Sequence, residues 1–205
     1  VMLVAFTQCD SLDMSPDSSI TDANYWKTEA HFSAFNIGLH AKMRDVSYNY
    51  FLLGEPRANL YCENNPFGGE AFEGVQELPH NTINKENPGI SNFAALYPVI
   101  NQLNLMISKT SANTFLSEAD KNYYLGEAYG MRAYLYFHLL RSWGDVVIHT
   151  DPTDGATIDI SKLAKAASPA TQVMELIKSD IEASEKAFGD DYNFKYGRHY
   201  WSLPA

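Results

Sequence analysis

The side chains that could perform chemistry are scattered along this chain rather than grouped. Its six histidines (31, 40, 80, 138, 149 and 199) include no pair at the i,i+4 spacing of a helical zinc site. Asp151 and Asp154 suggest a calcium loop, but the alternating oxygen ligands and the closing Glu are missing. Nucleotide-binding glycine motifs and the Gly-x-Ser-x-Gly of hydrolases are also missing. We therefore predict a non-enzyme with no catalytic residue, no metal site and no cofactor. A glycoside hydrolase is the weakest alternative, because no pair of acids is placed to suggest one.

Three polar residues fall on faces that are otherwise apolar. Arg132 needs an acidic partner if it is buried, because an unpaired buried charge is costly. The candidates for that partner are Glu127, Asp145 and Asp180. Asn104 is expected to be a hydrogen-bonded core amide, and His138 a core or interface residue rather than a ligand. We therefore interpret all three as structural residues of the core rather than as parts of a binding or catalytic site.

Recognition is better supported than catalysis, and it points to the stretch 53–89. This stretch is rich in Gly, Pro and Asn and has no helical or strand period. Loops this long in compact chains are usually functional. Aromatic rings can pack on the apolar faces of sugars while amides and charged groups bind hydroxyls. The candidate ligand contacts are Arg57, Asn59, Tyr61, Phe67 and Phe72. The alternative is an ordinary polar surface loop.

The element that must organise such a loop is a long helix ending at Trp143. Two apolar stripes run along it, one through Leu125, Leu135 and Leu139 and the other through Tyr136 and Leu140. Two stripes predict a helix packed on both sides, as in stacked helical hairpins. Ser117 is its expected N-cap, and Gly144 its stop. Gly130 inside it predicts a close approach of another helix, and an extended segment follows over 146–148.

Three further helices are expected around this central one. Thr28 is a candidate N-cap for the first, Gly54 and Pro56 end it, and Ser168 followed by Pro169 begins the last. Their predicted ranges are 28–52, 90–109 and 168–188. No βαβ alternation is present. The predicted fold class is mostly α, with tetratricopeptide-like helical hairpins and long irregular loops.

Charge and the first residues bear on partners and location. The formal net charge is −10 and Lys and Arg do not cluster, which argues against a nucleic-acid partner. No apolar run is long enough for a transmembrane helix. Residues 1–8 are expected to be the remnant of a secretion signal, and residues 9–22 a tether. Cys9 is placed like the lipid-bearing cysteine of a bacterial lipoprotein. The alternative is that residues 1–9 form a buried strand with a core cysteine.

A longer pattern covers the central helix and the turn after it. It reads Glu127-Ala128-x-x-x-Arg132-Ala133-Tyr134-x-Tyr136-Phe137-x-Leu139-x-x-x-Trp143-Gly144-Asp145-Val146. This resembles the signature helix of the SusD/RagB-like family, the outer-membrane nutrient-binding lipoproteins of Bacteroidetes. Cys9 with Leu12-Asp13 and Pro16, and Tyr97-x-x-Ile100-x-x-x-Asn104, are similar to other elements of that family. The resemblance spans about residues 9–205.

The resemblance implies that residues 23–205 are the N-terminal part of a longer SusD-like helical domain, truncated at its C-terminus. It implies a surface-exposed protein held to the outer membrane only through its lipid anchor. Such a protein binds a nutrient, most often a glycan and otherwise a peptide, and delivers it to a SusC-like TonB-dependent transporter without catalysis. From the residues alone, a helical-repeat adaptor that binds proteins and no small ligand is the alternative.

Overall fold

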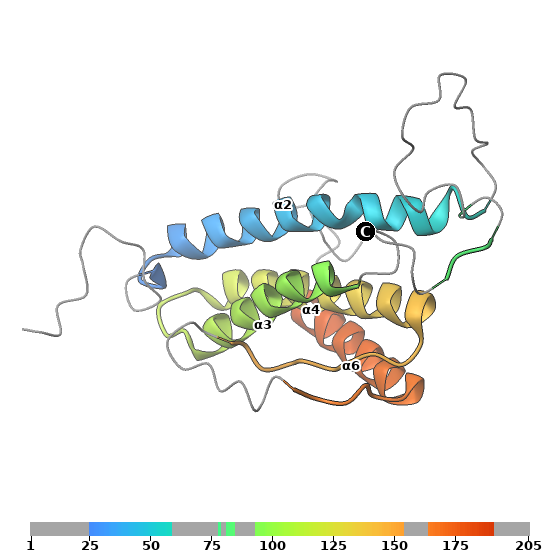
Figure 1. Cartoon of the computed structure of the whole chain (residues 1–205). Helices are drawn as coiled ribbons and strands as arrows, with labels where there is room; N and C mark the ends of the chain where they lie inside the picture. The colour runs from blue at the N-terminus through green and yellow to red at the C-terminus, as the bar shows by residue number, and fades with distance from the viewer. Residues whose placement is uncertain (1–24, 59–77, 79–80, 85–92, 154–163, 191–205) are drawn as a thin grey trace, which may run out of the picture.

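The computed structural model describes residues 25–58, 78, 81–84, 93–153 and 164–190 (Figure 1). Its helices are α2 (Glu29–Gly54), α3 (Tyr97–Ala112), α4 (Glu118–Trp143) and α6 (Ala170–Phe188), with a 3-10 turn, η1 (Ala94–Leu96), directly before α3. Figure 1 shows α2 along one side of the antiparallel α3–α4 hairpin and α6 along the other. The predicted mostly helical fold is confirmed. None of the described helices combines the length and the apolar character needed to cross a membrane.

Helix α4 is the centre of this arrangement, as its two stripes predict. It contacts α2, α3 and α6. Its side chains Met131, Leu135, Tyr136 and Leu139 are almost completely buried, together with Ile100 and Leu103 of α3 and Phe32 and Leu39 of α2. Burying apolar area on opposite sides of one helix is the main stabilising contribution expected here.

The predicted ends of α4 are confirmed in atomic detail. Ser117 Oγ accepts a hydrogen bond of 3.1 Å from the Asp120 backbone N–H, which satisfies one of the free donors of the first turn. At the other end, Gly144 has φ 77°, a backbone conformation that side chains disfavour. Its N–H donates to Leu140 O, so the chain leaves the helix at this glycine.

Two predicted helix starts are wrong. Helix α3 begins at Tyr97 rather than at residue 90, because Pro98 lacks an N–H and fits the first turn of a helix but not its interior. Helix α6 has Pro169 as its N-cap, not Ser168. The Ser168 N–H instead donates to Val146 O at 2.9 Å in an antiparallel bridge. The cap is supplied from a distance: Asp145 Oδ1 accepts a 2.8 Å hydrogen bond from the Ala170 N–H.

A glycine does mark a close approach of two helices, but the contact is at Gly126. A Cβ added to Gly126 would lie 2.7 Å from the ring of Phe188 on α6. Ser184 of α6 also donates to Gly126 O at 2.7 Å. Gly130, at which the sequence placed this contact, is buried one turn later in α4. The glycine at position 126 therefore sets how closely α6 packs on α4.

Candidate functional site

Among the predicted ligand contacts, Arg57 is the one that the described part of the chain contains. It is exposed in the turn that follows α2. Asn59, Tyr61, Phe67 and Phe72 lie outside the described residues, as does the predicted lipid attachment residue Cys9. The structure therefore shows no contacts for these five positions, and their roles stay predictions.

The base of the predicted recognition loop is nevertheless fixed on the scaffold. Leu78 is completely buried and packs against Leu52 near the end of α2, with Leu53 and Ile83 at the edge of the same small cluster. Asn81, which follows in the turn, has φ 51°, a conformation that Asn tolerates better than most residues. The start of the stretch and its described residues around Leu78 and Ile83 are thus held at the C-terminal end of α2.

A second feature is the extended segment 146–153, which we call the strap. It leaves the end of α4 and runs beside α3 (Figure 1). Side chains of α3 bind its backbone. Tyr97 donates through its hydroxyl to Val147 O at 2.8 Å. Asn101 Oδ1 accepts from the Thr153 N–H at 2.8 Å, and Asn101 Nδ2 donates to Thr153 O at 3.2 Å. The strap is therefore held along its length by side chains rather than by a sheet.

The middle of the strap is attached to a buried ion pair. The His149 carbonyl accepts from Asn104 Nδ2 at 2.9 Å and from the Tyr136 hydroxyl at 3.0 Å. Asn104 Oδ1 in turn accepts from Arg132 Nη1 at 2.7 Å. Arg132 binds Asp180 of α6 through two parallel hydrogen bonds of 2.8 and 2.7 Å. The prediction of a structural ion pair for Arg132 and of a bonded core amide for Asn104 is correct, and Asp180 is the acid.

Glu127, another candidate partner for Arg132, has a different role. Its carboxylate is completely buried and accepts hydrogen bonds from the Tyr123 hydroxyl at 2.6 Å and from Asn36 Nδ2. His40 Nε2 lies 3.2 Å from the same carboxylate. Asn36 and His40 both belong to α2, so this buried carboxylate joins α2 to α4. The third candidate, Asp145, caps α6 as described above.

His138 lies in the same interface, as predicted for a core or interface histidine. It is 1% exposed, and its Nε2 is 2.8 Å from Asn49 Oδ1 on α2. Its ring meets that of Tyr50 edge-on, with centroids 4.1 Å apart. Burial, and secondarily the Arg141 guanidinium, lower the pKa of His138 to about 4. The imidazole is therefore neutral near pH 7 and positions α2 rather than binding an anion.

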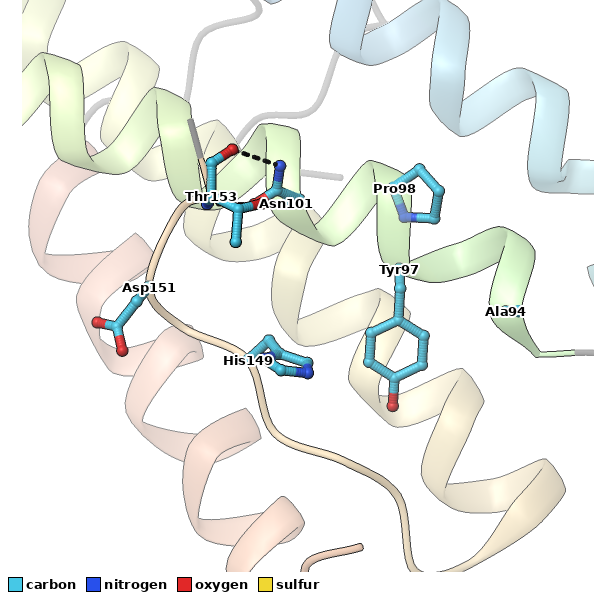
Figure 2. Close-up of a pocket in the computed structure, with 7 residues that line it drawn as sticks. All are labelled: Ala94, Tyr97, Pro98, Asn101, His149, Asp151 and Thr153. Carbon is cyan, nitrogen blue, oxygen red and sulfur yellow. Dashed lines mark hydrogen bonds between the residues drawn. The ribbon is translucent and has the colours of Figure 1, made fainter. Parts of the chain in front are cut away.

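A pocket of about 430 Å³ opens between the strap and the first turns of α3. Its lining residues are Ala94, Tyr97, Pro98, Asn101, His149, Asp151 and Thr153. Figure 2 shows the Tyr97 ring reaching down from α3 towards the His149 imidazole on the strap, with Asp151 farther along the strap. The Tyr97 and His149 rings are nearly perpendicular, with centroids 6.0 Å apart.

The polar groups of this pocket divide into two kinds. Asn101 and the Tyr97 hydroxyl are already bonded to the strap backbone. The His149 imidazole and the Asp151 carboxylate form no hydrogen bond within the described part of the chain. Burial, followed by the nearby Lys165 ammonium, lowers the pKa of His149, while Asp151 acts in the opposite direction. A neutral imidazole and a carboxylate beside an aromatic ring can bind the hydroxyl groups of a ligand.

Sequence reasoning missed this pocket. It named Tyr97 as part of the motif Tyr97-x-x-Ile100-x-x-x-Asn104, considered Asp151 only as a calcium ligand, and gave His149 no role. One signal was available: Tyr97, Asn101 and Asn104 recur at i, i+4 and i+7 and so share one face of a helix. Polar side-chain groups that repeat along one face of a helix can hydrogen-bond the backbone of a segment packed against that face. They therefore indicate that such a segment is present.

Comparisons with known proteins agree with the helical arrangement. Residues 10–200 match a SusD-like family model described as starch-binding and associating with the outer membrane. SusD-like protein P38 of Formosa agariphila is 31% identical over 204 residues, which cover 95% of this chain and 38% of that protein.

Solved structures show the same likeness. The structure of NanU from B. fragilis superposes with a TM-score of 0.79 at 67% identity, covering 92% of this chain and 36% of that chain. A SusD superfamily protein from Bacteroides vulgatus gives a TM-score of 0.75 at 62% identity, covering 86% of this chain and 34% of that chain. The chain thus spans a little over a third of the length of these relatives.

Proposed function

The chain belongs to the SusD-like family, and from this premise we propose that it is the N-terminal part of a surface protein that binds a glycan. The observation that carries the proposal is the match of residues 10–200 to a family described as starch-binding and outer-membrane-associated. The geometry supports it, because the helical scaffold forms a pocket with an aromatic wall and hydroxyl-binding groups. We propose binding without catalysis.

The ligand contacts that we propose on the loop are Arg57, Asn59, Tyr61, Phe67 and Phe72. The test is titration calorimetry on the full-length protein with glucose, N-acetylglucosamine and galacturonic acid and with their linear trisaccharides. Arg57→Ala and the double variant Phe67→Ala/Phe72→Ala should weaken binding. Phe115→Ala is the matched control, since Phe115 is a 51% exposed phenylalanine in the connection between α3 and α4. Absence of binding to every sugar, with retained binding to a partner protein, would support the adaptor alternative instead.

We further propose that Cys9 carries a lipid that holds the protein on the outer surface of the outer membrane. In this proposal residues 1–8 are the signal remnant, residues 9–22 the tether and residues 23–205 the start of the helical domain. The family description supports membrane association. Cys9→Ala should release the full-length protein from membranes and prevent incorporation of a labelled fatty acid. Cys62→Ala, which changes the other cysteine, should do neither. A wild type that is soluble and unlabelled would refute the anchor.

The glycan would then be delivered to a SusC-like TonB-dependent transporter. Family membership supports this step, because the resemblance implies such a partner. Tagged full-length protein, purified from outer membranes in mild detergent, should carry the transporter with it. Deletion of the gene for the co-purified transporter should abolish uptake of the bound glycan. Uptake that persists unchanged would refute the delivery step and leave glycan binding intact.

A further inference from the structure

We propose that the pocket between α3 and the strap is a saccharide subsite separate from the loop 53–89. In this subsite His149 and Asp151 bind sugar hydroxyls, Tyr97 forms the apolar wall, and Phe93 extends the site to a second sugar unit. The saccharide class rests on the proposed function, whereas the location and the contact residues come from the geometry of the pocket.

The position of His149 is the first argument. Its backbone is fixed on both sides: the N–H donates to the Tyr136 hydroxyl at 2.8 Å, and the carbonyl accepts from Asn104. The imidazole does not contribute to this attachment, because neither of its ring nitrogens is hydrogen-bonded within the described part of the chain. A half-buried polar ring on a rigid backbone, facing an open pocket, is oriented before a ligand arrives. Such preorganisation lowers the entropic cost of binding.

The end of the strap at Thr153 is also held in place by hydrogen bonds to α3. Asn101 Oδ1 accepts from both the backbone N–H and the hydroxyl of Thr153, at 2.8 and 2.9 Å. These bonds fix the far end of the strap against α3, as the dashed line in Figure 2 shows for the Asn101 amide and the Thr153 carbonyl. Asp151, two residues before Thr153, is exposed at the rim and presents a carboxylate that can accept from two hydroxyls.

The pocket holds one sugar unit, and its surroundings suggest where a second unit would lie. A volume of about 430 Å³ is at the small end of ligand sites and suits a single sugar ring. Beyond Tyr97 the aromatic surface continues: the Phe93 ring is 6.0 Å from that of Tyr97 and 5.7 Å from that of Trp143. Phe93 is 37% exposed and directly precedes Ala94, which lines the pocket. An apolar surface is therefore available where a second sugar would leave the pocket.

The test uses the full-length protein and the sugar that wild type binds most tightly among those named above, as monosaccharide and as trisaccharide. His149→Ala removes the imidazole contact, and Asp151→Asn removes the negative charge and replaces one of the two acceptor oxygens with an amide donor. We expect each change to weaken binding of both ligands about tenfold. Phe93→Ala should weaken binding of the trisaccharide severalfold and leave the monosaccharide unchanged. Asp45→Asn on α2 and Phe115→Ala are the controls, because both positions are exposed and outside the pocket lining.

The outcomes separate this proposal from the proposed function. If wild type binds glycan and both His149→Ala and Asp151→Asn bind it equally well, the pocket is not a subsite although the glycan function stands. Weakened binding by the pocket variants, with intact binding by both controls, supports the subsite. A wild type that binds none of the sugars overturns both proposals. Asp151→Asn keeps the size and exposure of the side chain, so loss of binding by this variant does not come from loss of the fold.

Discussion

Removal of one partner of the Arg132–Asp180 pair should be among the most damaging single changes to this fold. The two side chains are 5% and 2% exposed and share two hydrogen bonds. Among the described residues, Asp180→Leu leaves the buried Arg132 charge with one acceptor, Asn104 Oδ1. Breaking a buried pair in this way costs about 3 to 5 kcal/mol of unfolding free energy. That is a large part of the about 5 to 15 kcal/mol that holds a typical domain together.

The double variant Arg132→Met/Asp180→Leu should recover much of this loss. It removes both charges and replaces them with side chains that can pack, so the desolvation cost of the pair disappears as well. What remains is the buried Asn104 Oδ1, which loses its donor and costs about 1 to 3 kcal/mol. We therefore expect the double variant to be more stable than Asp180→Leu alone by about 2 kcal/mol.

Urea unfolding followed by circular dichroism measures these free energies, provided that the slope of the transition is unchanged. Lys42→Met is the control, because its pair with Asp45 is at the surface, where an ion pair contributes less than about 1 kcal/mol. The reasoning is refuted if Asp180→Leu costs no more than Lys42→Met. It is also refuted if the double variant is less stable than Asp180→Leu alone. In that case the unpaired Arg132 charge would not be the cause of the stability lost in Asp180→Leu.

Three further predictions concern single positions. His138 has a pKa of about 4 in the folded protein and of 6.5 in the unfolded chain, so the unfolded chain binds the proton first as the pH falls. The free energy of unfolding should therefore fall by up to about 3 kcal/mol between pH 6.5 and pH 4. His138→Gln should flatten this part of the pH profile measured by thermal unfolding, and an unchanged profile would contradict the assignment. Gly144→Ala forces a side chain into φ 77° and should cost about 1 to 3 kcal/mol in urea unfolding, whereas the exposed helical Gly38→Ala should cost nothing. Ser117→Ala removes the cap of α4 and should cost about 1 kcal/mol, while Ser117→Asp should retain most of the stability.

The central part of this fold could be predicted from sequence because its signals are local. Two apolar stripes, a capping serine and a glycine stop lie within α4, and they gave its bounds and its two-sided packing. The start of α6 was wrong by one residue for a non-local reason: its cap is the carboxylate of Asp145, which lies far earlier in the chain. No local pattern reports a cap supplied by another segment.

The pocket was beyond sequence reasoning for the same reason. Its wall comes from the first turns of α3 and its floor from the strap, and these meet only because side chains of α3 bind the strap backbone. The partner of Arg132 was narrowed to three acids but not chosen, because the choice depends on how α6 crosses α4. On the loop 53–89 composition alone guided the prediction, and of its proposed contacts the structure places Arg57, exposed beside the end of α2.

The bridge between Val146 and Ser168 has a consequence for how the chain tolerates change. After Val146 the polypeptide stays bound along α3 as far as Thr153, and at Ser168, two residues before α6 begins, it pairs with Val146 again. The position of α6 is therefore set by the Val146–Ser168 bridge and by the packing of α6 itself. It does not depend on the number of residues between Val146 and Ser168. Lengthening a loop whose ends are held together adds an entropic cost that grows only slowly with the number of residues. The register of α6 against α4 should therefore depend on the Val146–Ser168 bridge and on the Asp145 cap, both of which lie next to the helix ends that they join.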